Sequence, residues 1–417
     1  MKQSGFGKHH LAMGILFTTA SCNLYAQSSV TLYGLVDAGL NYLSNAQTGR
    51  SNGVIVGHSQ YSFQDGVTGG QQGSRWGLLG TEDLGGGMSA IFRLESGFAI
   101  NTGALGQGGA GMGRQAYVGL KSNLGTMTMG RQYDPVATLV GPFSAGAQWG
   151  GYMSAPAYDV DNFLNTRRIN NSIKYQSPDF NGLSLMGMYS FGGVPGSLGR
   201  NQTWSTGLAY THGSFSAAAA YLNARNPNLG IDAANPNAGT TPASNNIGSV
   251  GSASAPQSNP IYAGYASANT LQIIGVAAAY QIGSATVGAT YSNVQFKGLG
   301  NTATSGPNPF GYSGNATFNV TEVNLKYQIT PTLLAGVAYS YTHNSGAEDK
   351  ASATYHQGSL GLDYFVSKRT DVYTIVVYQH ASGTDSLGQS AVAQITGQTP
   401  SATDNQAAVR IGIRHRF

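Results

Sequence analysis

The stretch that decides the fold is VTLYGLVDAGLNY, residues Val30–Tyr42. Every second position from Val30 to Tyr42 is apolar or small, and the positions between them are mostly polar or lack a side chain. A strand with two such faces, one of them free of charge, is typical of a barrel wall with lipid on one side and water on the other. A soluble sandwich is the alternative, but it would need a second packed sheet, and the chain has too little other apolar surface for one.

The same alternation recurs along the chain and predicts an all-β protein. Strand-like stretches lie near residues 74–84, 88–100, 114–124, 125–134, 168–180, 183–192, 202–212, 214–225, 270–283, 285–297, 317–330, 332–344, 355–367, 370–381 and 407–417, about sixteen with the first. Short turns such as Asn181-Gly182 alternate with long connections at 45–73, 101–113, 134–167, 226–269, 298–316 and 382–406. Turns at one end and loops at the other predict a sixteen-stranded antiparallel transmembrane β-barrel.

The beginning of the chain indicates export. Residues 1–26 have a basic start, an apolar stretch at 11–20 and a small-residue cleavage site at Leu24-Tyr25-Ala26, which together are typical of a secretory signal peptide. We therefore expect one barrel domain over residues 27–417. Cys22, the single cysteine, would leave with the signal, so that no disulfide is expected; a lipoprotein modified on Cys22 is the alternative.

Composition agrees with a barrel in a membrane. Charged residues make up 9% of the 417 residues, against about 25% in ordinary soluble domains. No apolar run reaches the roughly 18 residues that a transmembrane helix needs. The formal net charge of +4 is too small to indicate a nucleic-acid partner.

The last strand, AAVRIGIRHRF at 407–417, shows which face meets water. Arg410, Arg414 and Arg416 alternate with Val409, Ile411, Ile413 and Phe417. An arginine at the lipid-facing midplane costs roughly 2–4 kcal/mol, so the arginine face must line the lumen. By the same alternation we place these charged side chains in the lumen: Asp37, Arg93, Glu95, Lys174, Arg410, Arg414 and Arg416. Arg93 and Glu95 share a face, either as an ion pair or as two separately solvated groups.

The stretch from Asp134 to Arg168 does not fit a strand. It contains three prolines and five aromatic residues, and its charges are sorted, with acids at Asp134, Asp159 and Asp161 and bases at Arg167 and Arg168. Loops longer than about 12–15 residues are usually functional or disordered, and the aromatic content argues against disorder. We expect this loop to fold into the lumen, where its acidic edge would face a basic wall.

Motifs for catalysis are weak. Gly106–Gly111 fits G-x-G-x-x-G, but it lies between two expected strands rather than between a strand and a helix. The eight histidines do not occur in metal-ligand spacing with acids or cysteines. We therefore expect no enzyme, no metal and no cofactor; a barrel hydrolase whose triad assembles only in space is the alternative.

Several motifs together resemble the general trimeric porins of Gram-negative outer membranes, in their beta-proteobacterial branch. They are VTLYGLVDAGL in the first strand, SRWGLLGTEDLGGG at 74–87, GRQAYVGLKSNLG at 113–125, MGRQYDP at 129–135 and the terminal IRHRF. The resemblance covers the whole chain after residue 26. It implies a homotrimer in the outer membrane and an inward-folded third loop, here 134–167, as the constriction.

The resemblance also implies roles for single residues. Arginines matching the family's basic wall are Arg75, Arg114 and either Arg167 or Arg168, opposite Asp134, Asp159 or Asp161; Arg131 would belong to the wall or anchor the base of the loop. Phe417 resembles the family's terminal signal for the barrel-assembly machinery. Some relatives carry a lysine where Leu35 stands here.

The function that follows is passive diffusion of small ions and hydrophilic solutes. Lumenal bases at Arg410, Arg414, Arg416, Lys174 and Lys326 outnumber the acids Asp37, Glu322 and Asp363, which predicts mild anion selectivity. A substrate-specific channel, for example for sugars, is the alternative, and a structural or adhesive barrel is a third reading. The expected partners are outer-membrane lipid and other copies of the chain, with the small Gly34 and Ala38 on the outward face allowing close packing between subunits.

Overall fold

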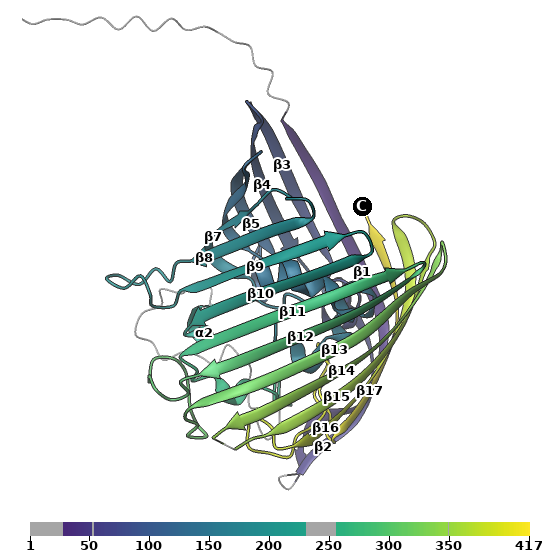
Figure 1. The fold of residues 1–417 in the computed structure, drawn as a ribbon. Helices are drawn as coiled ribbons and strands as arrows, with labels where there is room; N and C mark the ends of the chain where they lie inside the picture. The colour runs from purple at the N-terminus through teal and green to yellow at the C-terminus, as the bar shows by residue number, and fades with distance from the viewer. Residues whose placement is uncertain (1–27, 52–53, 231–255, 349) are drawn as a thin grey trace, which may run out of the picture.

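The computed structural model describes residues 28–51, 54–230, 256–348 and 350–417. The expected signal peptide lies outside the described residues, and so does the middle of the loop expected at 226–269. Strands run side by side around the molecule and dominate its architecture (Figure 1). In the ranges that the structure describes, no helix is long and apolar enough to cross a bilayer.

In the part of the chain that the structure describes, one antiparallel sheet contains all 17 strands. In chain order they are β1 (Ser29–Ser51), β2 (Val54–Asp65), β3 (Arg75–Gly85), β4 (Met88–Gly97), β5 (Gln115–Ser122), β6 (Gly125–Gln132), β7 (Ile169–Gln176), β8 (Leu183–Ser190), β9 (Thr203–His212), β10 (Phe215–Arg225), β11 (Thr270–Ile282), β12 (Ala285–Lys297), β13 (Asn315–Thr330), β14 (Leu333–Ala347), β15 (Ala353–Phe365), β16 (Thr370–Gly383) and β17 (Asn405–Arg416). Strands β3 to β17 lie within a few residues of the stretches that the alternation predicts.

Strand β1 closes the sheet into a barrel. Its residues Leu35–Leu43 pair with β17, and its residues Ser29–Leu35 pair with β3 on the other edge. Strand β2 pairs with Ala38–Ser51 of β1, beyond β3 on the same edge. The closed ring therefore contains sixteen of the 17 strands, as the sequence predicts.

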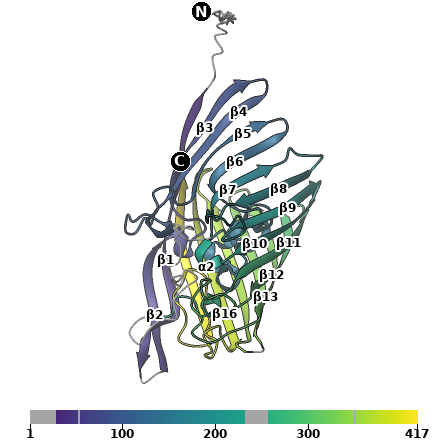
Figure 2. The same ribbon diagram turned by 90° about the vertical axis from the view of Figure 1, so that its left-hand side faces the viewer.

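The expectation of a loop over 45–73 is wrong for most of that stretch. Strand β1 continues to Ser51 and turns back as β2, so that the two form a hairpin that extends past the neighbouring strands (Figure 2). Only the short helix α1 (Gly66–Gly69) and its flanks connect β2 to β3. The hairpin is stabilised by pairing with the extended end of β1, which the local pattern of β2 alone does not reveal.

The two faces of the wall differ as the alternation predicts. On β15, Leu360, Leu362 and Tyr364 are exposed, whereas Gln357 and Asp363 on the other face are buried. An apolar outer band with polar residues on the inner face is the pattern of a barrel whose outside meets lipid.

Short helical turns occupy the stretch 134–168 and lie against the inner face of the wall. They are η2 (Val136–Val140), η3 (Gly141–Phe143), η4 (Gly146–Gly150), η5 (Tyr152–Ser154) and η6 (Pro156–Asp159). Turn η2 contacts β9, β10 and β11, and η4 contacts β14 and β15. The buried ring of Trp149 in η4 rests on Gly336 and Gly361, which are directly paired on β14 and β15.

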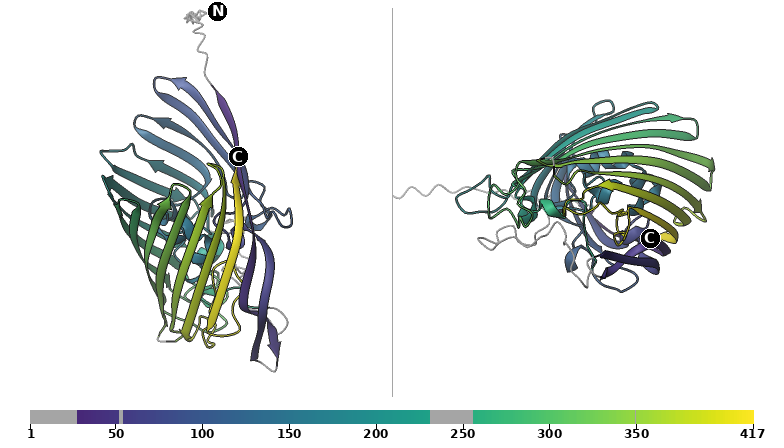
Figure 3. Two further views of the ribbon diagram at one scale, coloured as in Figure 1. Left: turned by 90° about the vertical axis from the view of Figure 1, so that its right-hand side faces the viewer. Right: turned by 90° about the horizontal axis from the view of Figure 1, so that it is seen from below.

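A second group of loops packs beside this stretch. The short helix α2 (Pro227–Gly230) and the turn η7 (Ala263–Tyr265) belong to the connection between β10 and β11, and a further turn η1 (Gln107–Gly109) precedes β5. Ile261 and Tyr265 are fully buried against Phe296 and Phe318 of the wall. Together with the segment 384–404, the connection between β10 and β11 packs on the side of β10 to β16, whereas η1 lies beside β4. Figure 3 shows loops gathered inside the ring of strands in the view from below.

Candidate pore constriction

Two arginines and one glutamate form the centre of the site. Arg75 begins β3, Glu95 lies on β4, and Arg114 directly precedes β5, so the three side chains come from consecutive parts of the wall. The Arg114 Nε lies 2.7 Å from Glu95 Oε1, and the Arg75 Nε lies 3.8 Å from Glu95 Oε2. One buried carboxylate thus holds two guanidinium groups side by side.

Two tyrosines complete the polar contacts of Glu95. The hydroxyl of Tyr33 donates to Glu95 Oε2 at 2.7 Å, and that of Tyr133 donates to Oε1 at 3.3 Å. Arg114 Nη2 in turn donates to the Tyr133 hydroxyl at 2.9 Å. The carboxylate is therefore fixed from both sides, which also fixes the arginines that it binds.

Two more arginines lie next to these tyrosines. The guanidinium of Arg93 stands over the Tyr33 ring at 5.3 Å, and that of Arg168 stands over the Tyr133 ring at 5.6 Å. Both distances are within the range of cation–π contacts. Of the two alternatives for Arg93 and Glu95, the described residues show no ion pair between them: Arg75 and Arg114 contact the two oxygens of that carboxylate instead. We call Arg75, Arg93, Arg114 and Arg168 the arginine wall.

Two cavities meet at the arginine wall. One, of about 210 Å³, lies between Arg75 and Arg114 and the stretch 134–168. The other, of about 360 Å³, lies on the side of Leu35 and Phe417. Gln72, Arg75, Arg114 and Tyr133 line both. The two cavities therefore share these arginines as a common boundary.

The acids of the loop do not face this wall, and the expected opposition of charges is wrong in this respect. The carboxylate of Asp134 accepts from the backbone amides of Val136 and Ala137 and from the side chain of Asn162. Asp159 accepts from the amide of Leu164 and from Thr166. All are buried within the loop itself, where aspartates commonly satisfy backbone donors of turns.

The third loop acid, Asp161, is bound to the far side of the barrel. Its Oδ2 accepts from Ser292 Oγ on β12 at 2.9 Å, and its Oδ1 accepts from the amide of Phe163. Burial, followed by the nearby Asp159 carboxylate, raises the pKa of Asp161 to about 7. Burial also raises the pKa of Asp134 and of Asp159. Near neutral pH, Asp161 therefore carries less negative charge than an ordinary aspartate.

The remaining basic residues of the loop region separate into different places. Arg167 stands over the Tyr262 ring at 5.1 Å and so points to the packed loops rather than to the arginine wall. Arg131 donates to the carbonyl of Gly113 and to the side chain of Asn170, which anchors the base of the loop.

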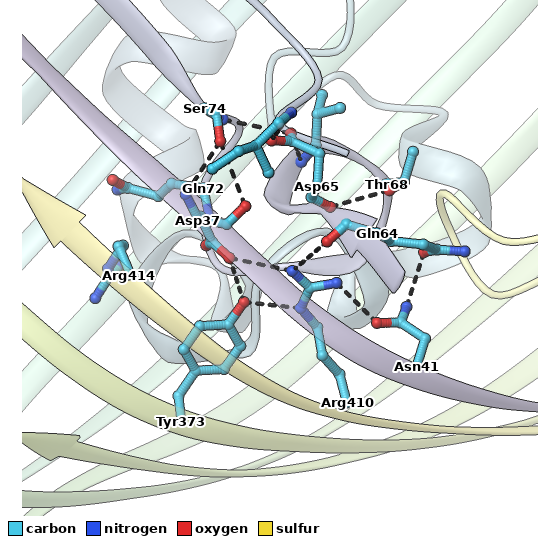
Figure 4. Close-up of polar contacts among 12 residues, drawn as sticks. Asp37, Asn41, Gln64, Asp65, Thr68, Gln72, Ser74, Tyr373, Arg410 and Arg414 are labelled. Atoms are coloured by element: carbon cyan, nitrogen blue, oxygen red, sulfur yellow. Dashed lines mark hydrogen bonds and ion pairs between the residues drawn. The ribbon is translucent and has the colours of Figure 1, made fainter. Parts of the chain in front are cut away.

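The arginines of the last strand are neutralised by acids rather than left free. Arg410 is fully buried and bonds to Asp37 Oδ1 at 3.1 Å, to the Tyr373 hydroxyl and to Asn41 (Figure 4). Figure 4 also shows that Asp37 accepts from the backbone amide of Gln72, which connects strand β1 to the segment after α1.

The other two arginines of β17 share one aspartate. Arg414 lies 3.1 Å from Asp371 and 3.4 Å from Asp363, and Arg416 lies 3.0 Å from Asp371. The surplus of lumenal bases counted from the sequence left out two acids, Asp371 and Glu95. Because Asp371 pairs with Arg414 and Arg416, the arginines of β17 do not supply a surplus of positive charge. Lys174 is also engaged, since its Nζ donates to the carbonyl of Tyr133 at 3.0 Å.

A metal centre has no support in the described ranges, where no three His, Cys, Asp or Glu side chains gather in a way that could hold an ion. The site instead offers the fixed positive charges of the arginine wall.

Gly34 was expected to allow close packing between subunits, but in the structure it contacts Phe417 of the same chain. The main chain of Phe417 exchanges two hydrogen bonds with Gly34, at 3.0 and 3.1 Å. The Phe417 ring covers Gly34 so closely that an added Cβ would lie 2.4 Å from the ring. Gly34 is therefore buried by the chain's own last residue and is not available for contact with another subunit.

A closed barrel with an apolar outside and a row of charged groups inside defines a membrane channel. The model of the Gram-negative porin family matches residues 12–384. Outer membrane porin protein 32 of Delftia acidovorans is 27% identical over 98% of this chain and 99% of its own. An outer membrane porin protein of Bordetella pertussis is 37% identical, over 48% of this chain and 56% of its own length.

Solved structures show the same fold. The anion-selective porin from Comamonas acidovorans superposes with a TM-score of 0.68 at 21% identity, over 94% of this chain and all of that chain. OmpT of Vibrio cholerae, in its trimer form, superposes with a TM-score of 0.62 at 16% identity, over 94% of this chain and 99% of that chain. The chain belongs to the Gram-negative porins, and it is a passive diffusion channel of the outer membrane.

Proposed function

We propose that this channel favours small anions, and that the stretch 134–168 and the arginine wall form its constriction. The observation that carries the proposal is the charge balance at the wall: Arg75 and Arg114 bind the Glu95 carboxylate. Arg93 and Arg168 stand over the two tyrosines that donate to this carboxylate, so the four guanidinium groups have one carboxylate among them. The acids of the loop, which would otherwise oppose them, accept hydrogen bonds inside the loop or from β12. The similar barrel from Comamonas acidovorans is an anion-selective porin, which supports the same sign of selectivity here.

The size of the effect follows from Coulomb's law. One uncompensated charge acts on an ion about 10 Å away with roughly 1.7 kcal/mol at an effective dielectric constant of 20. Screening in about 0.1 M salt, where the Debye length is about 10 Å, lowers this to the order of 0.6 kcal/mol. The same charge attracts an anion and repels a cation, so one uncompensated charge would favour anions over cations by about 1.2 kcal/mol, or roughly eightfold, and further uncompensated charges would increase this preference.

Neutralising the wall tests the proposal. The double substitution Arg75→Gln and Arg114→Gln should move the zero-current potential in a KCl gradient toward cation preference and should raise the conductance, because two bulky guanidinium groups leave the passage. Arg369→Gln, in the exposed turn between β15 and β16, is the matched control and should leave the potential unchanged. An unchanged potential in the double variant would show that these arginines do not set the selectivity.

We also propose export with removal of residues 1–26, assembly as a homotrimer and recognition of Phe417 by the barrel-assembly machinery. The pattern of the first 26 residues supports the first, and the trimer form of the Vibrio cholerae relative supports the second. The terminal position of Phe417, paired with Gly34 at the seam between β17 and β1, supports the third. Native mass spectrometry in mild detergent tests the trimer, since a monomer that conducts normally would contradict it.

A further inference from the structure

The cavity of about 210 Å³ beside Arg75 and Arg114 has two unlike sides. One side carries the two guanidinium groups, and the other carries an apolar patch of the loop, formed by Ala137, Pro142 and Leu164, with Tyr152 and Asn165 beside it. We propose that this cavity is a binding subsite for small carboxylates with an apolar body, such as an aromatic ring. The inference rests on the proposed anion preference, and it adds that one class of anions binds at the constriction and does not simply diffuse through it.

The charged side of the cavity has guanidinium N–H groups that are available to bind a solute. Arg114 is 6% exposed; its Nε and Nη2 are bonded to Glu95 and Tyr133, but among the described residues its Nη1 has no hydrogen-bond partner. Arg75 donates from its two terminal nitrogens only to neutral oxygens, of Gly73 and Gln72, each at 3.3 Å. A buried donor without a partner is costly, and a carboxylate accepts from two guanidinium groups at once.

The opposite side of the cavity is apolar at Ala137, Pro142 and Leu164, and Tyr152 and Asn165 are its polar residues from the loop. The loop acids Asp134 and Asp159 accept from backbone amides of their own loop and point away from this side. Over Ala137, Pro142 and Leu164, the hydroxyl groups of a solute would lose water without gaining equivalent hydrogen bonds, which is unfavourable. An apolar body would instead remove apolar surface from water, which is favourable in proportion to the area covered.

The apolar side is also preformed. Leu164 packs so closely on Gly146 that an added Cβ at residue 146 would lie 2.6 Å from Leu164 Cδ1. Phe163, which also lines the cavity, is wedged against Gly275 of β11 and is 3% exposed. A site that is already in place binds a solute without the cost of ordering the loop.

Current block in planar bilayers tests the inference with the intact trimer. Chloride current would be recorded while benzoate, gluconate or benzamide is added to the bath. Benzoate should interrupt the current at a concentration about fivefold or more below that of gluconate, because only benzoate uses both sides of the cavity. Benzamide, which has the same ring without the charge, should not block over the same range.

Variants locate the effect. Leu164→Asn should raise the half-blocking concentration of benzoate severalfold, whereas Leu198→Asn, on an exposed loop between β8 and β9, should not change it. Equal block by benzoate and gluconate, block by benzamide, or full benzoate affinity in Leu164→Asn would overturn the subsite. The wild-type potential in KCl alone tests the anion preference separately, so an anion-selective channel without benzoate block would reject the subsite and keep the proposed function.

Discussion

The docking of Trp149 on two glycines gives a sharp prediction about the loop. An added Cβ at Gly336 would lie 2.1 Å from Trp149 Cδ2, and one at Gly361 would lie 2.5 Å from Cε3. Non-bonded carbon atoms settle at about 3.5 Å or more, so Gly336→Ala lacks roughly 1.4 Å of clearance. Overpacking of this kind costs about 1–3 kcal/mol, which here would be spent on displacing the ring and its turn η4.

Displacement of η4 should also loosen the contact between the loop and β13, the strand next to β14. The amide of Ala145 donates to Glu322 Oε1 at 2.7 Å, next to Trp149, and would be strained by a shift of the ring. We expect Gly336→Ala to lower the midpoint of heat-induced unfolding in detergent and to increase single-channel current noise.

The matched control for this prediction lies on the neighbouring strand. Gly358 of β15 has no atom within 4 Å of an added Cβ, so Gly358→Ala should behave as wild type. If Gly336→Ala also matched wild type in midpoint and noise, Trp149 would not hold the loop against the wall, and the docking argument would fail.

Three further predictions concern other parts of the barrel. Burial raises the pKa of Asp385 from 3.8 to about 7, so the packing of its loop weakens as pH rises from about 4 to 7, by up to about 4 kcal/mol. Asp385→Asn should flatten this pH dependence, measured by hydrogen exchange corrected for intrinsic rates. An unchanged slope would exclude Asp385 as the cause of the pH dependence. Arg410→Gln leaves the buried Asp37 without its ion-pair partner and should destabilise the barrel by about 3–5 kcal/mol, seen as a lower unfolding midpoint; an unshifted midpoint would refute the pairing. Deletion of Phe417 removes two main-chain hydrogen bonds at the barrel seam and should reduce the yield of folded barrel, whereas normal yield would count against its role in assembly.

The strands could be predicted from sequence because their signal is local. Period-2 alternation and turn residues are set by the chain itself, and β3 to β17 follow them closely. Strand β2 was not predicted because it pairs with the extended end of β1. Whether a polar stretch forms a loop or a strand depends on such a partner, which the local sequence does not show.

The site could be predicted only in part. Alternation and family resemblance indicated the lumenal side of Arg75 and Arg114, and both line the two cavities. The direction of Asp134, Asp159 and Asp161 could not be predicted, because an aspartate in a loop can face water or accept from nearby amides, and only the folded loop decides.

Ion pairs between strands were equally hidden from the sequence. Asp371 meets Arg414 because β16 and β17 pair with these two residues opposite each other. Register is a property of two strands together, and a shift by one residue moves every side chain to the other face. The anion preference therefore rests on the arginine wall, and the arginines of β17 contribute little to it.

The zero-current potential of the wild-type channel tests the central claim most directly. With about 0.1 M KCl on one side and 1 M on the other, we expect a potential of the sign that marks chloride as the more permeant ion. The preference should be stronger when both solutions are dilute, because the Debye length falls from about 10 Å at 0.1 M to about 3 Å at 1 M. A potential of zero, or one of the opposite sign, would contradict the assignment of the arginine wall as the element that selects ions.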